Sequence, residues 1–413
     1  MRKDDEQARA TAEAVARQSY GKLVAFLAAR TRDVAAAEDA LADAFASALA
    51  HWPRSGVPDA PEAWLLTAAR RKLADASRRR RTASNAEGHV RLIAEELNAV
   101  RDETPIADER LRLMFACAHP AIDAAMRAPL ILQTILGLDA ETIGSAFLVS
   151  PAAMGQRLVR AKSRIKEAGI PFRMPDAADL PERLDAVLEA IYAAFAEGWT
   201  DPAGTEARRR DLAEEAIWLG RLAASLLPDE PEAKGLLALM LYAEARRRAR
   251  RTADGDYVPL AEQDPASWNA DLIEEAETLL SRASRAGVSG RYQLEAAVQS
   301  AHVVRRVTGR ADWEAIAALY GALQAMTGSP VVAINRAVAL AESEGAEEGL
   351  ALLDEAAADA RLADYQPYWA ARADLLARLG DAKAADTAYE RAIGLESDPA
   401  VRRFLQQRRD ALR

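Results

Sequence analysis

Residues 139–168 read DAETIGSAFLVSPAAMGQRLVRAKSRIKEA, and this stretch decides how the front half of the chain folds. The pattern predicts a short helix over Ala140–Phe147, a three-residue break, and a second helix that begins at Pro151 with Ser150 as its N-cap. Two helices joined in this way make a helix-turn-helix, and an ordinary helical hairpin is the alternative. Five Lys and Arg residues on the second helix favour DNA as the ligand.

In a DNA-binding helix-turn-helix, the first turn of the second helix meets base edges and the later positive charges meet phosphates. The candidate base readers are therefore Ala152, Ala153, Gln156 and Arg157. The candidate phosphate contacts on the same helix are Arg160, Lys162 and Arg164, and Ser150 at its start completes the set.

A second basic helix is predicted upstream, over residues 61–81. Between residues 68 and 82 it carries seven positive charges against the single acid Asp75, namely Arg70, Arg71, Lys72, Arg78, Arg79, Arg80 and Arg81. Like charges at this density repel unless an anion is near, which favours a phosphate-binding face over a solvated charged helix. Trp64 precedes them and is either a core residue or a platform for a single-stranded base.

Composition indicates an all-α chain of more than one domain. At about 150 residues per domain, 413 residues suggest two or three cores. Alanine is abundant and aromatic residues make up only 6%, which is typical of packed helices. A lone cysteine, Cys117, excludes an internal disulfide, and no segment resembles a signal peptide or a membrane span. We therefore expect a cytoplasmic protein that has no membrane partner.

Charge is divided unevenly along the chain. The total is -9, yet residues 1–173 hold 26 Lys+Arg and 22 Asp+Glu, so they carry +4 and the remaining residues carry -13. We expect a first helical domain over 11–81, a linker over 82–106 with at most a short helix at 90–100, and a helix-turn-helix domain without a wing over 107–170. A second linker over 171–181 then leads to a repeat domain over 182–413.

The back half repeats a pattern of small and large residues every 34 to 39 positions. The repeated sets are Ala276, Leu280 and Ala283; Ala315, Leu319 and Ala322; Gly349, Leu353 and Ala356; and Ala385, Tyr389 and Ala392. Small residues let paired helices approach closely, so the pattern resembles tetratricopeptide repeats and predicts an α-solenoid that could take a protein or peptide partner. A basic, Gly- and Pro-containing insertion over 246–267 interrupts one helix pair.

The order of these elements resembles bacterial sigma factors of the extracytoplasmic-function group. The residues that carry the resemblance are WLLTAAR at 64–70, DERLRLMFACAHPA at 108–121 and QRLVRAK at 156–162. With the repeat domain, including GRLAASLLPDEPEAKGLLALML at 220–241, the chain resembles the subgroup that carries a tetratricopeptide-like C-terminal extension.

The resemblance implies partners for particular residues. The helix over 35–52 matches the family surface for core RNA polymerase, which places Glu38, Asp39, Asp43 and Phe45 there. The loop at 53–60 and the helix from Trp64 match the part that opens and reads the minus-ten promoter element, and the helix-turn-helix matches the reader of the minus-thirty-five element. Arg71 stands where the family usually has Asn, and the start of the reader helix also differs, so the promoter sequence stays open.

The sequence thus predicts a sigma factor that binds core RNA polymerase and promoter DNA. Its acidic repeat domain is expected to regulate it, with an intramolecular contact to the basic helices as one means. The alternative is a repeat scaffold whose helix-turn-helix binds DNA without polymerase. No phosphate-binding glycine loop or nucleophile elbow is present, and Cys117 with His119 does not complete a zinc site, so we expect no enzyme activity, metal or cofactor.

Overall fold

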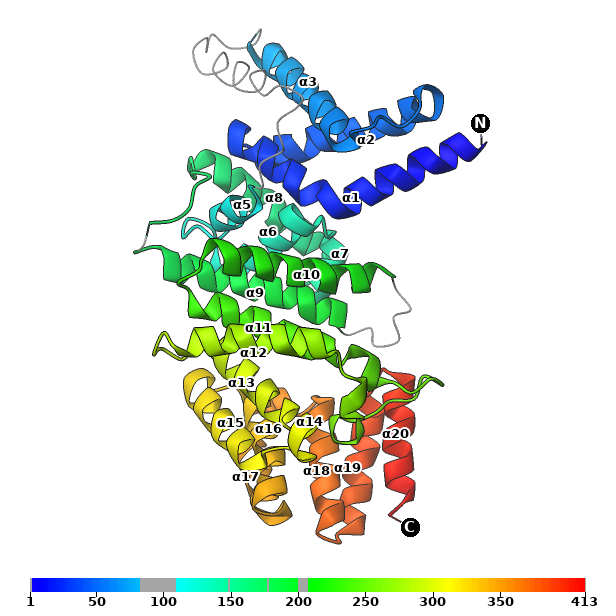
Figure 1. Cartoon of the computed structure of the whole chain (residues 1–413), viewed down its shortest axis with the longest axis vertical. Helices are drawn as coiled ribbons and strands as arrows, with labels where there is room; N and C mark the ends of the chain where they lie inside the picture. Colours follow the sequence, from blue (N-terminus) through cyan, green and yellow to red (C-terminus); the bar gives the residue numbers. More distant parts are fainter. Residues whose placement is uncertain (1, 82–108, 148, 177, 200–206, 413) are drawn as a thin grey trace. The chain divides into compact units, whose positions relative to one another are not determined.

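A computed structural model shows the chain as a succession of helices (Figure 1). The structure describes residues 2–81, 109–147, 149–176, 178–199 and 207–412. Within these ranges no strand forms, and one isolated β-bridge joins Arg251 to Tyr257. The prediction of an all-α fold is therefore confirmed.

Contacts group the chain into two compact units, Met1–Glu197 and Gly198–Arg413. This division is coarser than the predicted domains, whose boundaries stay predictions. The predicted second linker, 171–181, falls inside the first unit. The predicted first linker and the short helix expected at 90–100 lie outside the described residues.

The first unit begins with three long helices, α1 (Arg2–Thr31), α2 (Val34–Ser55) and α3 (Pro61–Arg81), each packed against the other two. The Asp33 carboxylate caps α2 by accepting a hydrogen bond from the Ala36 N–H at 3.0 Å. We expected a loop from Pro53, but α2 runs on to Ser55. A bond from the Gly56 N–H to the Trp52 carbonyl at 3.0 Å closes this last turn, and the φ of Gly56, +83°, then ends the helix.

Four shorter helices follow, α5 (Arg110–Cys117), α6 (Ala124–Leu136), α7 (Ala140–Ala146) and α8 (Pro151–Glu167). The last two form the predicted helix-turn-helix. Their turn is tight, since the Val149 N–H donates to the Gly144 carbonyl at 2.8 Å and a Cβ on Gly144 would lie 2.6 Å from the Val149 oxygen. Glycine is therefore required at the end of α7.

α8 begins at Pro151, as the sequence predicts. Ser150 takes the N-cap position with an extended backbone, as the sequence predicts, although its side chain makes no capping hydrogen bond. Pro151 removes one of the N–H groups that would otherwise need a partner. The helix is held by one buried face made of Met154, Leu158, Ala161 and Ile165.

α9 (Leu180–Trp199) ends at the boundary of the two units, and the second unit contains the remaining helices. These are α10 (Ala207–Leu226), α11 (Pro231–Ala245), α12 (Ala270–Ser284), α13 (Arg291–Val303), α14 (Arg305–Thr308), α15 (Trp313–Thr327), α16 (Pro330–Ser343), α17 (Ala346–Ala356), α18 (Gln366–Arg378), α19 (Ala382–Leu395) and α20 (Pro399–Asp410). Four short 3-10 helices lie among them, at Arg247–Arg250, Leu260–Glu262, Pro265–Ser267 and Ala360–Leu362. Helices that are neighbours in sequence pack against each other along most of the unit.

Small residues permit the close helix pairs of the second unit. A Cβ on Gly349 of α17 would lie 2.7 Å from the Ala337 carbonyl oxygen of α16, and Ala385 and Ala392 of α19 are fully buried. Ala322 of α15 is exposed instead, because Ile316, Ala317 and Leu323 form the buried face of that helix. The likeness to tetratricopeptide repeats itself stays a prediction.

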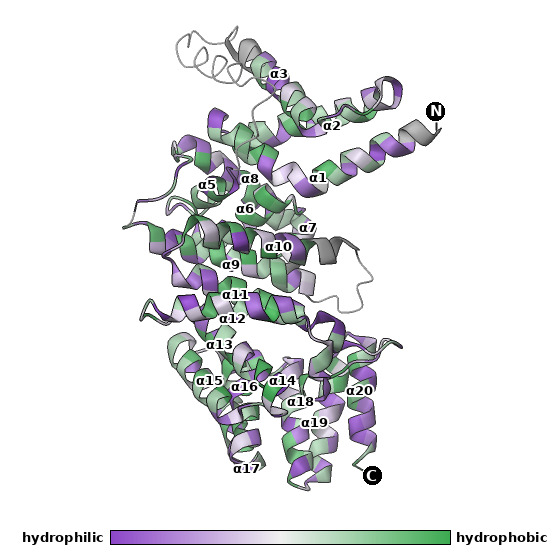
Figure 2. Ribbon diagram, viewed as in Figure 1, coloured by the Kyte–Doolittle hydropathy of each residue, from purple (hydrophilic) through white to green (hydrophobic). Residues whose placement is uncertain are grey.

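The insertion after α11 fastens the last helix of the unit. Arg251 forms an ion pair with Asp398, the N-cap residue of α20, and Arg403 of α20 forms another with Asp256 at 2.8 Å. The rings of Tyr257 and Phe404 meet edge to face with centroids 5.4 Å apart. Figure 2 shows hydrophilic and hydrophobic residues alternating along α20, which suits a helix with one packed and one solvated face.

Candidate polymerase and nucleic-acid interface

The proposed polymerase residues of α2 lie in two different environments. Asp39 and Asp43 are exposed, and Phe45 is half-buried. Glu38 is only 13% exposed because it forms an ion pair with Lys162 of α8, with 2.6 Å between Oε2 and Nζ. Burial raises the pKa of the Glu38 carboxyl, and the hydrogen bond and charge of Lys162 oppose that rise.

Sequence reasoning missed part of the exposed face of α2. Ala35, Ala42, Ala46 and Leu49 are exposed at the same helical spacing as Asp39, and Leu49 keeps 46% of its surface. A row of small residues with one apolar side chain and flanking carboxylates is suited to pack against another helix. Helical periodicity could have found this row, since its members recur every three or four positions.

The basic residues of α3 do not form one uniform face. The Arg70 guanidinium is half-buried and lies 5.2 Å from the centre of the Phe26 ring of α1. Arg71 is exposed, and Lys72 is exposed beside Asp43 of α2, at 3.5 Å. The backbone of α3 continues to Arg81, but the side chains of Arg78, Arg79, Arg80 and Arg81 lie outside what the structure describes.

Trp64 lies partly in the core and partly at the surface, so a role as a base platform stays a prediction. Its ring packs edge to face on the buried Trp52, with centroids 5.5 Å apart, and also lies near the His51 ring. The side chain is still half-exposed at the start of α3. One part of the ring is thus anchored in the core while another part can be reached from solvent.

α8 presents most of the predicted DNA-binding residues to solvent. Ser150, Ala152, Gln156, Arg157, Arg160 and Arg164 are exposed, and Ala153 is half-buried. The three arginines also line a hollow of 560 Å³ whose other wall contains Ile122 and Met126. Lys162 is the exception in this set, because it is turned toward Glu38.

A second hollow, of 780 Å³, lies between α2, α3 and α8. Carboxylates and ammonium groups share its wall, namely Asp33, Asp39, Asp43, Lys72, Lys162 and Lys166. Lys166 forms an ion pair with Asp33 at 2.7 Å. Neither Asp33 nor Lys166 was singled out as a binding residue from the sequence, because no local pattern links positions 133 residues apart.

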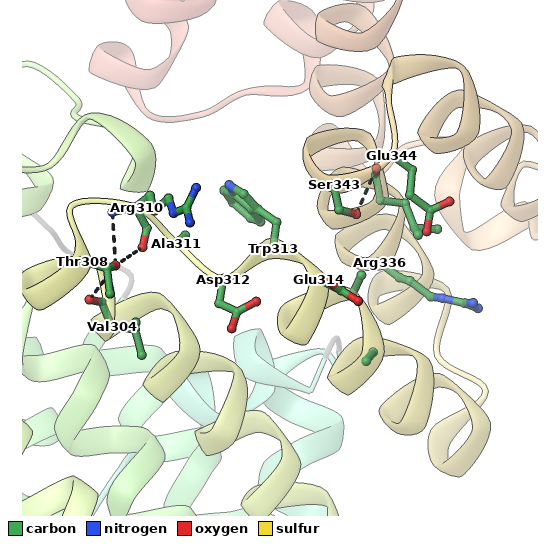
Figure 3. Close-up of a pocket in the computed structure, with 13 residues that line it drawn as sticks. Val304, Thr308, Arg310, Ala311, Asp312, Trp313, Glu314, Arg336, Ser343 and Glu344 are labelled. Atoms are coloured by element: carbon green, nitrogen blue, oxygen red, sulfur yellow. Dashed lines mark hydrogen bonds between the residues drawn. The ribbon is translucent and has the colours of Figure 1, made fainter.

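The second unit has a hollow of its own, of 980 Å³, at the junction of α14, α15 and α16 (Figure 3). Arg310, Asp312, Trp313 and Glu314 line one side of it, and Arg336 and Glu344 line another. Both signs of charge are present in its lining, together with a tryptophan ring. A peptide partner for the repeat stays a proposal.

Cys117 and His119 are engaged separately. The Cys117 thiol is buried 3.6 Å from the Thr134 hydroxyl, and burial raises its pKa to about 12. Nδ1 of His119 accepts a hydrogen bond from the Ala121 N–H at 3.1 Å. Across the described ranges, no three His, Cys, Asp or Glu side chains are grouped as metal ligands. None of the described helices has the length and apolar character needed to cross a membrane.

Comparison with known families gives two matches in this chain. Residues 15–83, which contain most of α1 and all of α2 and α3, match the model for sigma-70 region 2. Residues 183–284 match a model described as a family of unknown function (DUF6596). No solved structure matches the chain. The first match identifies the class of protein as a sigma factor of the sigma-70 type, which acts in transcription directed by RNA polymerase.

A relative extends the comparison over nearly the whole chain. The uncharacterized protein R00370 of Rhizobium meliloti (strain 1021) is 40% identical over 400 residues, which cover 96% of this chain and 93% of the relative. The chain belongs to the same family as this relative. Its sigma-70 region 2, together with the further C-terminal match, makes this chain a sigma factor of the extracytoplasmic-function kind with a C-terminal extension. Sigma factors are not enzymes, and their partner is the RNA polymerase core.

Proposed function

We propose that this sigma factor binds core polymerase through the exposed face of α2 and reads promoter DNA with α3 and α8. The observation that carries the proposal is the face formed by Asp39, Asp43 and Leu49. It lies within the sigma-70 region 2 match and in the same unit as the basic helix-turn-helix. Carboxylates at the edge of a small-residue row complement a basic partner helix and fix its orientation.

DNA recognition divides between the two basic helices. In α8, Ala152 and Gln156 are exposed at the first turns, where a recognition helix meets base edges. Arg157, Arg160 and Arg164 follow on one flank and are placed to neutralise phosphates. In α3, Trp64 and Arg71 are the reachable candidates for the separated strand of the minus-ten element.

The experiment uses the full chain with purified core RNA polymerase and a library of genomic promoters. Wild-type protein should direct transcripts from a small promoter set, and Asp39→Lys with Asp43→Lys should weaken core binding at least about tenfold, since like charges then meet across the interface. Glu38 is left unchanged because its reversal would also break the buried pair with Lys162.

The matched control is Glu6→Lys with Glu13→Lys, which makes the same change of charge at two exposed positions of α1. Core binding by the control should equal that of the wild type. Equal loss in both double variants would show a non-specific charge effect. Promoter binding by a wild-type chain that does not bind polymerase would favour the alternative, a repeat scaffold whose helix-turn-helix acts alone.

A further inference from the structure

Two arginines of the insertion over 246–267 lie on the ring of Trp199. The guanidinium carbons of Arg247 and Arg250 are 5.0 Å and 4.3 Å from the ring centre. Arg247 also donates a hydrogen bond to the Gly198 carbonyl at 3.3 Å. Arg250 donates one to the Trp199 carbonyl at 3.0 Å. Two planar cations are thus held close to each other, and all of these residues belong to the second unit.

A second pair of arginines lies on the buried ring of Trp268. The guanidinium carbons of Arg246 and Arg305 are 6.0 Å and 5.5 Å from the ring centre. Burial lowers the pKa of Arg246 to about 10, and the positive charge of Arg250 acts in the same direction, so the two pairs are neighbours. Burial also lowers the pKa of Arg250, and the charge of Arg251 adds to this effect. These five residues are the arginine cluster, namely Arg246, Arg247, Arg250, Arg251 and Arg305.

Carboxylates balance only part of the charge of the arginine cluster. Arg247 forms an ion pair with Glu244 at 2.8 Å, and Arg251 forms one with Asp398. Within the part of the chain that the structure describes, the other three form no ion pair and donate to carbonyl or amide oxygens, namely Arg246, Arg250 and Arg305. Five guanidinium groups and two carboxylates leave a net charge of +3 at one place in an acidic unit.

Buried N–H groups in and beside the cluster also lack acceptors. Nη2 of Arg247, Nε of Arg251 and Nε1 of Trp268 are buried and have no hydrogen-bond partner among the described residues. The side chains of Arg247 and Arg251 are only 15% and 10% exposed. Buried donors without acceptors are costly, and a bound ion is one of the explanations for them in native proteins. All three atoms are donors, so the group that would satisfy them accepts hydrogen bonds, and the net charge of the cluster favours an anion.

We propose that the arginine cluster binds a small anion that carries two linked phosphate groups. A guanidinium group binds phosphate oxygens through two parallel hydrogen bonds, and Arg250 uses only one of its five N–H groups, on the Trp199 carbonyl. A phosphate group carries a charge of about -1.5 to -2 at pH 7, so two of them balance the cluster and a single one does not. No residue of the cluster takes part in the proposed function, and this inference is therefore independent of it.

The first experiment is a calorimetric titration of the full chain with inorganic pyrophosphate. Wild-type protein should bind pyrophosphate saturably at one site, and should bind orthophosphate at least about tenfold more weakly at the same ionic strength. A parallel titration with ADP distinguishes two sources of the linked phosphates. Tighter binding of ADP assigns the site to a nucleotide, and equal binding assigns it to the diphosphate group alone.

Variants of the 3-10 helix Arg247–Arg250 test which arginine binds the anion. Arg250→Gln should weaken pyrophosphate binding at least about tenfold, because a charge-assisted hydrogen bond is lost. Arg250→Lys keeps the charge and a donor for the Trp199 carbonyl but loses the planar fork, so it should bind with an affinity between those of Arg250→Gln and the wild type. The matched control is Arg248→Gln, which removes the same charge at an exposed position of the same helix and should bind as wild type does.

Hydrogen exchange with mass spectrometry locates the bound anion. Pyrophosphate should slow amide exchange over residues 246–268 in wild type and in Arg248→Gln, and should leave α3 and α8 unchanged. If Arg250→Gln does not fold, as judged by circular dichroism, the comparison is made with Arg250→Lys. The proposal is overturned by the absence of saturable binding in wild type, by equal loss in Arg248→Gln, or by protection that is confined to the basic helices of the first unit.

Discussion

Single glycines decide two close approaches in the first unit. Gly144 lets the turn between α7 and α8 fold back on the end of α7, and Gly21 lets α1 meet α6. In the sequence these glycines look like interruptions of a helical pattern, which carry a cost of about 1 kcal/mol each relative to alanine. The packed structure supplies the reason for them, because a Cβ at either site would overlap a backbone oxygen.

His302 is a titratable residue whose surroundings are set by the fold of the second unit. It is 8% exposed and packs edge to face on Trp313, with ring centroids 5.4 Å apart. Burial lowers its pKa to about 4, and the positive charges of Arg246 and Arg305 act in the same direction. The folded second unit therefore holds this histidine neutral at pH 7.

We predict that the buried His302 makes the folded protein less stable in acid. Between about pH 6.5 and pH 4, His302 is protonated in the unfolded chain but stays neutral in the folded chain. The free energy of unfolding therefore falls as the pH falls. Across that window the loss is about 3 kcal/mol, and His302→Gln should remove most of it. About 2 kcal/mol of this loss falls between pH 7 and pH 5. Urea unfolding at these two pH values measures it, with the exposed His51→Gln as the control. Parallel pH dependence in wild type and His302→Gln would contradict the assignment.

At the scale of elements, α8 is the best predicted part of the molecule. Its start at Pro151 follows from the Ser-Pro pair, and its buried face follows from Met154, Leu158 and Ile165 at helical spacing. Periodicity cannot predict which element each flank of α8 contacts. Two basic flanks look equivalent in the sequence, yet one contacts α2 and the other is exposed.

The insertion over 246–267 is an element whose role only the structure reveals. From the sequence it is a basic interruption of a helix pair, with no stated function. In the second unit it fastens α20 through Arg251, Asp256 and Tyr257. Arg251 and Asp398 are 10% and 29% exposed, so this ion pair is shielded from solvent more than most surface pairs.

We therefore predict that Arg251→Ala loosens α20. Loss of a partly buried charged hydrogen bond costs about 2 kcal/mol, which corresponds to amide exchange about 30-fold faster over residues 399–410. Asp398→Asn should have a similar effect although asparagine still caps the helix, since the charge that binds Arg251 is lost. Hydrogen exchange with mass spectrometry measures this.

Arg361→Ala is the control for the α20 prediction. Arg361 pairs with Asp359 in the same unit, but its side chain is 71% exposed, and such surface pairs contribute little. Exchange of α20 should then match the wild type. If Arg251→Ala also leaves α20 protected, the apolar contact of Tyr257 with Phe404 is sufficient by itself and the ion pair is dispensable.

At the scale of the whole molecule, the structural boundary changes the charge argument. When the sequence is divided after residue 173, the first part has a net charge of +4 and the second a net charge of -13. The units divide after Glu197 instead. Residues 1–197 hold 27 Lys+Arg and 28 Asp+Glu, so they carry -1, and the second unit carries -8. The difference comes from the acids of 174–197, among which Glu182 pairs with Arg127 inside the first unit.

The second unit is still acidic. We predict that its negative charge weakens the binding of DNA to the basic helices of the first unit. A chain that ends at Glu197 should bind promoter DNA several times more tightly than the full chain at low salt, and this difference should shrink above about 0.5 M salt, where the Debye length is only a few ångströms. Affinity measured over a salt series tests this. Weaker binding by the shorter chain, or loss of its transcription activity, would mark the second unit as an activating part.

The sequence by itself determined the class of fold, the helix-turn-helix and the sigma-factor family, because these depend on local spacing and on motifs that lie within one helix or one turn. Tertiary structure alone decided which of the basic and acidic side chains face each other. Glu38 and Lys162 are 124 residues apart, and no local pattern joins them. Their contact follows from the fit of whole surfaces in the first unit rather than from any single stretch of the chain.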